Sequence, residues 1–255
     1  MQSYFQLISS FDVSIIGWSL VIGCSVLWGA SKAGIKGVAT IAVPLMAYVF
    51  GSKASTGIVL PMLIIADVMA VIYYNRHAQW NVLVKILPWT MLGVMLGVWA
   101  GDKMNEEAFK NVMAVLIVIS IGIMFWWERR KSASVPDFWW FAAAMGIAAG
   151  FTTMIGNLAG AIVTIYLLAM HMPKDQFIGT GAWFFMIINV FKVPMHVVFW
   201  GTITWQTMSV NLLMIPAIAL GFYLGVKIVG RLKDDFYRKF VLVMTALAAL
   251  VLLIR

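Results

Sequence analysis

The chain has 255 residues, of which 63% are hydrophobic and only 11% are charged, and its mean hydropathy is +0.95. A soluble domain is usually about 45–50% apolar and roughly 25% charged, so the composition excludes an ordinary soluble enzyme or binding domain and indicates several membrane-spanning helices. The formal net charge of +8 comes mainly from lysines and arginines in short polar segments, which is typical of the positive-inside rule rather than of nucleic-acid binding.

Ten hydrophobic runs follow one another along the chain. They lie at 13–30, 38–50, 54–75, 82–101, 109–127, 138–153, 158–170, 177–200, 206–228 and 236–254. Most of them are long enough for a spanning helix, which needs about 20 apolar residues. The runs at 38–50 and 158–170 hold 13 residues each, roughly 20 Å of helix against a bilayer core of about 30 Å. We therefore expect an all-α polytopic membrane protein of about ten helical segments, two of them short and either broken or re-entrant.

The second half of the chain repeats features of the first half around a polar linker at 128–137. A Pro-x4-Gly-x3-Gly-Val pattern begins at Pro88 and again at Pro216. Five runs in each half would give the two halves opposite orientations, a plan that secondary transporters often use; if the short runs re-enter, the inversion does not follow from the count. The sequence predicts a single transmembrane domain over 1–255, with a first repeat at 13–127 and a second, inverted repeat at 138–254.

The distribution of basic residues predicts the orientation in the membrane. When the polar segments alternate between the two sides, 11 lysines and arginines fall on one side and 4 on the other. The richer side is expected to be cytoplasmic. This orientation places the linker in the cytoplasm and both termini on the opposite side.

Two glycine-rich breaks, at 30–40 and 150–161, precede the short runs. A broken helix in a membrane frees backbone N–H groups and persists only in buried protein or at a cavity. A helix that begins there directs its N-terminal N–H groups at the cavity and favours an anion. The residues predicted to bind the substrate at these breaks are Gly34, Lys36, Gly37, Thr40, Gly156, Asn157, Gly160 and Thr164. The alternative is that the glycines only allow close helix packing, with Lys32 and Lys36 at the cytoplasmic edge.

Charged residues within apolar runs form a second group of candidates. Asp67 and Lys192 each lie far from any loop, and a charge at that depth needs a partner or a cavity. Asn189 and His196 share a helix face with Lys192 by their spacing. We hypothesise that Asp67 and Lys192 form an intramembrane ion pair, or that Lys192, with Asn189, attracts the anion while Asp67 and His196 take part in proton coupling. A purely structural ion pair is the alternative.

The sequence gives no sign of a cofactor or a metal. Cys24 is the single cysteine, so neither an internal disulfide nor a cysteine metal site is expected. No Walker loop, zinc-protease motif, nucleophile elbow or dinucleotide fingerprint is present. The expected partners are a small anion and the lipid bilayer, without nucleic acid, and a homo-oligomer is left open.

Several short motifs, taken in order, resemble the sulfite exporter TauE/SafE family, also called the sulfonate uptake permease group. These motifs are Gly34-Ile35-Lys36-Gly37 leading to Val43-Pro44-Leu45, Ala54 to Gly57, Arg76-His77-Ala78-Gln79-Trp80, and Gly93 to Gly97 with their later echo. The second half departs from the family pattern: Gly156 to Gly160 and then Ile165 to Leu168 stand where a glycine cluster and a second Pro-Leu are usual.

The resemblance implies a carrier in the bacterial inner (plasma) membrane for small sulfur oxyanions or organosulfonates such as sulfite or sulfoacetate, often an exporter. With the site reasoning above, it predicts a secondary transporter that works by alternating access and has periplasmic termini. A membrane-embedded enzyme using Asp67 and His196, or a structural or assembly subunit, remains as the alternative.

Overall fold

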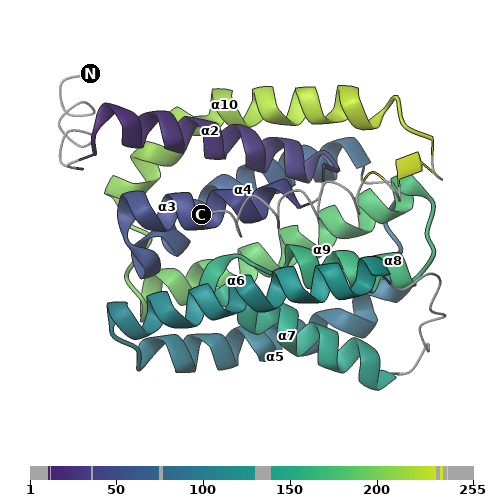
Figure 1. The fold of residues 1–255 in the computed structure, drawn as a ribbon, viewed down its shortest axis with the longest axis horizontal. Helices are drawn as coiled ribbons and strands as arrows, with labels where there is room; N and C mark the ends of the chain where they lie inside the picture. Colours follow the sequence, from purple (N-terminus) through teal and green to yellow (C-terminus); the bar gives the residue numbers. More distant parts are fainter. Residues whose placement is uncertain are drawn as a thin grey trace.

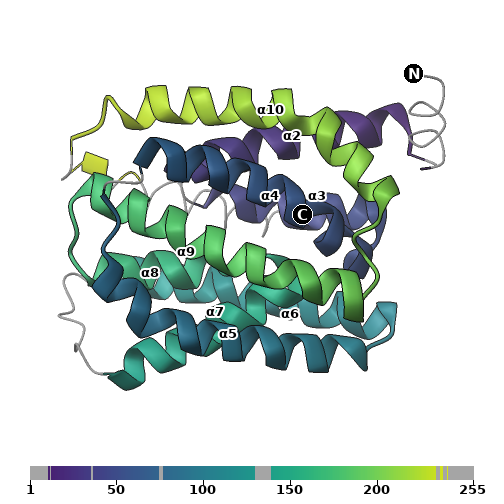
Figure 2. The same ribbon diagram turned by 180° about the vertical axis from the view of Figure 1, so that it is seen from behind.

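The computed structural model describes residues 13–35, 37–74, 77–129 and 139–233, together with Phe11, Phe236, Tyr237 and Phe240. Within these residues the chain forms helices and no strands, which confirms the predicted all-α class. The long helices run side by side along the length of the molecule, as the front and back views show (Figures 1 and 2).

The helices follow the predicted hydrophobic runs closely. They are α2 (Ile15–Lys32), α3 (Val38–Phe50), α4 (Ser52–Tyr74), α5 (Trp80–Asp102), α6 (Glu106–Arg129), α7 (Trp139–Gly156), α8 (Gly160–Ala169), α9 (Lys174–Pro194), the π-helix η2 (Met195–Phe199) and α10 (Trp205–Val229). The first nine runs correspond to these helices. The tenth run, apart from Phe236, Tyr237 and Phe240, lies outside the described residues, as does the linker beyond Arg129.

Helix length separates two classes of segment. Among the described residues, α2, α4, α5, α7, α10 and the continuous α9–η2 are long and apolar enough to cross a membrane. The helices α3 and α8 have 13 and 10 residues. At 1.5 Å per residue they reach about 20 Å and 15 Å, well below a bilayer core of about 30 Å. The structure thus contains the two short helices that the sequence predicted.

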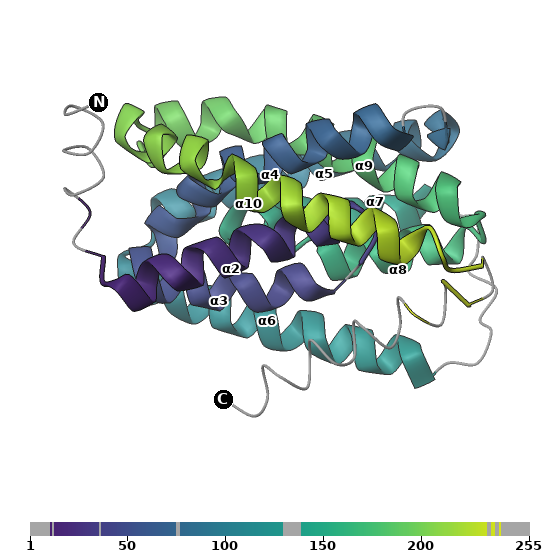
Figure 3. The ribbon, with the colours of Figure 1, turned by 90° about the horizontal axis from the view of Figure 1, so that it is seen from above.

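Two helix pairs are packed with their backbones in contact. Helix α2 lies beside α10, and α5 lies beside α7 (Figures 1 and 3). A Cβ added to Gly93 of α5 would overlap the carbonyl oxygen of Ile147 on α7, and one added to Gly221 of α10 would overlap that of Val26 on α2. Small residues allow this close approach between membrane helices. We call these two contacts the glycine seams.

The two seams use corresponding positions of the chain. Gly93 and Gly221 are 128 positions apart, whereas their partners Val26 and Ile147 are 121 positions apart. The reverse contacts obey the same offsets. A Cβ on Gly29 would overlap the carbonyl oxygen of Ile218, and one on Gly150, 121 positions later, would overlap that of Thr90, 128 positions before Ile218. The same packing arrangement therefore occurs twice.

A proline ends the regular part of α9. Pro194 has no N–H to donate and its ring disfavours a continuing α-helix. The chain continues from Met195 to Phe199 as a π-helix instead, a wider turn that often occurs at functional sites. The run at 177–200 is thus one continuous rod whose last turn is wider than an α-helical turn.

Candidate functional site

The two breaks predicted from the sequence line one cavity. The cavity has a volume of about 50 Å³ and lies between α2, α3, α4, α7, α8 and α9. Six of the predicted substrate-binding residues line it: Gly37, Thr40, Asn157, Gly160, Thr164 and Asn189. Trp28, Lys32 and Phe185, which the sequence analysis did not place in a site, are also part of its wall. The volume is enough for a few water molecules, and the wall has enough polar groups to bind them.

The first break is shaped by two glycines with positive φ angles and stabilised by hydrogen bonds from two tyrosines. Gly34 has φ +118° and Gly37 has φ +91°, values that suit glycine and disfavour residues with a Cβ. The hydroxyl of Tyr74 donates to the carbonyl of Ala33 at 3.2 Å, and that of Tyr237 donates to the carbonyl of Gly34 at 2.8 Å. These bonds satisfy carbonyl groups that the end of α2 leaves free.

The second break is formed around Asn157. This residue has φ 56°, the left-handed region that asparagine tolerates better than most residues. Its side-chain amide donates to the carbonyl of Thr56 on α4 at 3.3 Å. Gly156, also predicted as a site residue, packs near Leu158 and Met113 and is absent from the cavity wall as described. The same is true of Gly34, which lies against Ile178 and Tyr237 instead.

Two helix N-termini meet at the cavity. Helix α3 begins after Gly37 and α8 begins at Gly160, and both glycines line the cavity. From there the helices extend to opposite ends of the molecule, α3 to the left and α8 to the right of Figure 1. The free N–H groups and the positive dipole ends of both helices therefore point toward the same space. This arrangement favours an anion.

A buried ion pair borders the cavity. Lys32 Nζ lies 2.7 Å from Asp67 Oδ1, and the two side chains are 8% and 0% exposed. Asn189 Nδ2 donates to the other carboxylate oxygen of Asp67 at 2.7 Å. The ammonium of Lys32 also lies 3.9 Å from the centre of the Phe185 ring, within the range of a cation–π contact.

The partner of Asp67 thus differs from the hypothesised one. The sequence analysis considered Lys192, and left Lys32 at the membrane edge as an alternative. The sequence offered no clear signal for a buried Lys32, because this lysine stands at the end of its hydrophobic run beside Ser31, a residue common in loops. Lys36, the other lysine of the first break, lies outside the described residues.

Lys192 lies behind the cavity wall. Its Nζ is bonded to Asn157 Oδ1 at 2.6 Å and to Thr153 Oγ1 at 3.2 Å, and lies 3.5 Å from Asn189 Oδ1. All three of these residues line the cavity. Lys192 is 0% exposed. The predicted residues Asn157, Asn189 and Lys192 are therefore brought together in one hydrogen-bond network.

His196 lies beyond this network. It is fully buried on η2. Its Nδ1 lies 2.8 Å from the hydroxyl of Thr202, and its ring packs edge-on against Trp200. His196 does not belong to the described cavity wall. Within the described ranges, no three His, Cys, Asp or Glu side chains come together as a metal site.

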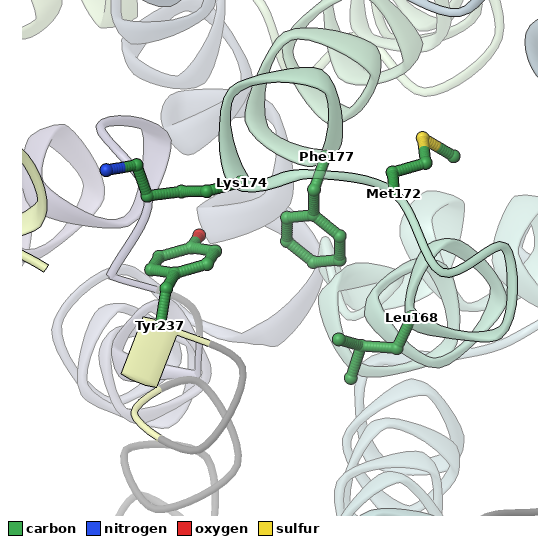
Figure 4. A pocket seen from close by; sticks show the side chains of 5 residues that line it. All are labelled: Leu168, Met172, Lys174, Phe177 and Tyr237. Atoms are coloured by element: carbon green, nitrogen blue, oxygen red, sulfur yellow. The ribbon is translucent and has the colours of Figure 1, made fainter. Parts of the chain in front are cut away.

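The two ends of the molecule are hollowed to different degrees. At the end where α8 meets α9, a cavity of only about 10 Å³ is lined by Leu168, Met172, Lys174, Phe177 and Tyr237 (Figure 4). Figure 4 shows the rings of Phe177 and Tyr237 beside each other. At the opposite end, where α3 ends and α10 begins, a hollow of about 450 Å³ includes Phe50, Ala54 and Thr202 in its wall.

Comparison with known proteins connects this site to a family. No curated protein and no solved structure matches the chain. The family model described as Sulfite exporter TauE/SafE matches residues 21–252, which include both breaks, both glycine seams and the cavity. Because this match covers nearly the whole chain, the protein belongs to the sulfite exporter TauE/SafE family, and this membership implies a multi-pass membrane transporter of sulfur anions.

Proposed function

We propose that this protein is a secondary carrier that exports small sulfur oxyanions or organosulfonates across the bacterial inner membrane by alternating access. The substrate binds in the cavity between the two breaks, near the middle of the membrane. The observation that carries the proposal is the meeting of two helix N-termini, those of α3 and α8, at one cavity that also contains the ammonium of Lys32.

The chemistry of the cavity wall suits an oxyanion. The first turns of α3 and α8 offer backbone N–H groups, and Thr40 and Thr164 offer hydroxyl donors from the same two helices. Oxygen atoms of a sulfite or sulfonate group accept hydrogen bonds in several directions at once, so donors on opposite walls can bind one such group. Asn157 and Gly160 provide the remaining contacts from the second break.

Matched packing supports the proposal of two inverted repeats, at 13–127 and 138–254. The glycine seams join α2 to α10 and α5 to α7 through positions that keep constant offsets between the halves. Carriers built from inverted repeats bind substrate at the repeat interface and open to each side in turn. The hollow of about 450 Å³ at one end and the cavity of about 10 Å³ at the other fit one such state.

The orientation in the proposal comes from the basic residues. The bias of 11 to 4 in lysine and arginine favours a cytoplasmic linker and periplasmic termini. In this orientation the narrow end shown in Figure 4, which contains Lys174, faces the cytoplasm. The wide end then faces the periplasm.

Gly160 offers a direct test of the site. A Cβ at this position would meet no atom within 4 Å, and the residue lines the cavity, so Gly160→Leu places a side chain in the substrate space without a backbone clash. Gly23→Leu is the matched control, because a Cβ there also meets no atom within 4 Å and Gly23 is exposed on α2.

The assay measures efflux of sulfite, sulfoacetate and methanesulfonate from proteoliposomes, with and without a pH gradient. We expect wild type and Gly23→Leu to transport at least one of these anions, and Gly160→Leu to lose transport while keeping its yield and its thermal unfolding temperature. Transport by Gly160→Leu at the wild-type rate would place the substrate elsewhere. Failure of the wild type to move any sulfur anion in either direction would refute the carrier.

A further inference from the structure

Lys192 has the surroundings of an ammonium group. Three oxygen atoms surround its Nζ, at 2.6, 3.2 and 3.5 Å. An ammonium carries three N–H donors and no acceptor, so one donor is available for each oxygen. A neutral amine has only two N–H bonds and one lone pair, which would have to accept from the Thr153 hydroxyl. The geometry offers an oxygen acceptor to every donor of the charged form.

The directions of the two amide hydrogen bonds around Lys192 are fixed by the neighbours of those amides. Asn189 directs its NH2 group at the carboxylate of Asp67, which only accepts, so its carbonyl oxygen faces Lys192. Asn157 directs its NH2 group at the carbonyl of Thr56, so its oxygen also faces Lys192. Both amides therefore accept from the ammonium. The three oxygens are neutral.

The two lysines of the network thus differ in charge balance. The Asp67 carboxylate is ion-paired with Lys32 at 2.7 Å, whereas the Nζ of Lys192 is hydrogen-bonded to neutral oxygens. Counted over the described residues, the network beside the cavity contains two ammonium groups and one carboxylate, a net charge of +1. The positive charge of this network lies one side chain away from the cavity. The intervening residues, Asn157, Asn189 and Thr153, each contact Lys192 and line the wall.

We infer that the cavity selects anions that carry a single negative charge, with Lys192 as the residue that sets this preference. The inference rests on the proposed carrier function and narrows its substrates to sulfonates and singly protonated sulfur oxyanions. One bound negative charge neutralises the network. A dianion would leave one uncompensated negative charge inside the membrane, where charges are expensive.

Methanesulfonate and sulfate test this inference as a matched pair. Both are tetrahedral sulfur anions of similar size, and they differ by one charge at neutral pH. Binding is measured by calorimetry and by thermal stabilisation on the purified full chain in detergent at constant ionic strength. We expect wild type to bind methanesulfonate ~10-fold or more tightly than sulfate, because bound sulfate leaves one negative charge uncompensated at membrane depth. A tenfold ratio of affinities corresponds to less than the full cost of such a charge.

Four variants change the charge in known steps. Lys192→Met makes the network neutral and should weaken methanesulfonate binding by ~10-fold or more, while Lys192→Arg keeps the wild-type ratio of the two affinities. Asp67→Asn raises the net charge to +2 and should shift the ratio toward sulfate. The double variant Lys32→Met with Asp67→Asn restores +1 and should restore the wild-type ratio. This double variant separates the charge count from damage caused by either single change.

The outcomes distinguish the inference from the function on which it rests. Equal or tighter binding of sulfate by wild type, or an unchanged ratio in Asp67→Asn, overturns the charge preference and leaves a carrier of sulfur anions intact. An unchanged affinity for methanesulfonate in Lys192→Met removes Lys192 from the role. If wild type neither binds nor transports any sulfur anion of the two panels, the proposed function fails and the inference fails with it.

Discussion

The ion pair between Lys32 and Asp67 allows a stability prediction with a defined magnitude. The two charged atoms lie 2.7 Å apart, and the side chains are 8% and 0% exposed. Unit charges at that separation attract by about 6 kcal/mol at an effective dielectric constant of about 20. Removing one partner of a buried pair costs about 3–5 kcal/mol, because the other charge stays buried without compensation. We expect a loss of this size in the free energy of unfolding for Lys32→Met and for Asp67→Asn.

Removing both charges should cost much less. In the double variant no charge remains to be compensated, and the introduced side-chain amide would keep an oxygen acceptor for Asn189, which donates to the native carboxylate of Asp67. We expect the double variant to lie within about 2 kcal/mol of wild type, so that the coupling energy between the two sites is about 4 kcal/mol or more.

The assay is denaturant unfolding of the purified protein in mild detergent, followed by circular dichroism. Lys227→Met is the control, because Lys227 is an exposed lysine of α10 and should change the unfolding free energy by no more than about 0.5 kcal/mol. Strictly additive losses in the double variant would refute the reasoning, since additivity is expected only of side chains that do not interact.

Three further predictions concern packing, capping and the first break. Gly29→Ala should destabilise the protein by about 1–3 kcal/mol, because the added Cβ would overlap a carbonyl of α10. In the control Gly23→Ala, on the same helix, the added Cβ meets open space, and this variant should be stabilised by about 0.5–1 kcal/mol. Equal shifts in the unfolding temperature of the two variants would contradict the close packing at the seam. Glu106→Gln should lower the unfolding temperature and remove part of its salt dependence, because the Glu106 carboxylate accepts from the Ser52 N–H at the start of α4. Tyr237→Phe should cost about 1 kcal/mol through the lost hydroxyl bond to the first break, and unchanged thermal unfolding would argue against that bond.

Hydropathy predicted the positions of the helices well because apolar runs and polar segments alternate so sharply. Helix α3 occupies the predicted run from Val38 to Phe50. It begins after Gly37 and ends before Gly51, and both glycines have positive φ values, +91° and +83°. These are local signals, so a single sequence contains them. The meeting of Asn157, Asn189 and Lys192 was also accessible, since a polar residue at membrane depth needs a polar partner.

The identity of each partner was harder to predict. Lys32 stands at the end of its hydrophobic run, where hydropathy cannot distinguish a loop lysine from a buried one. Its pairing with Asp67 depends on which faces of α2 and α4 meet, and this is decided by tertiary packing. In the same way, Pro194 signals an interrupted helix but does not specify the π-helix that follows it. Pairing and turn type depend on contacts between segments far apart in sequence.

The glycine seams have a consequence for biosynthesis. Helices α2 and α5 are made early, yet the surfaces that fit against Gly29 and Gly93 belong to α10 and α7. The first half of the chain is therefore made before either of its contact faces has its partner helix. When the second half has been inserted, each half packs against helices of the other, α2 on α10 and α5 on α7. The finished molecule is interlocked, and neither half can leave without opening both seams.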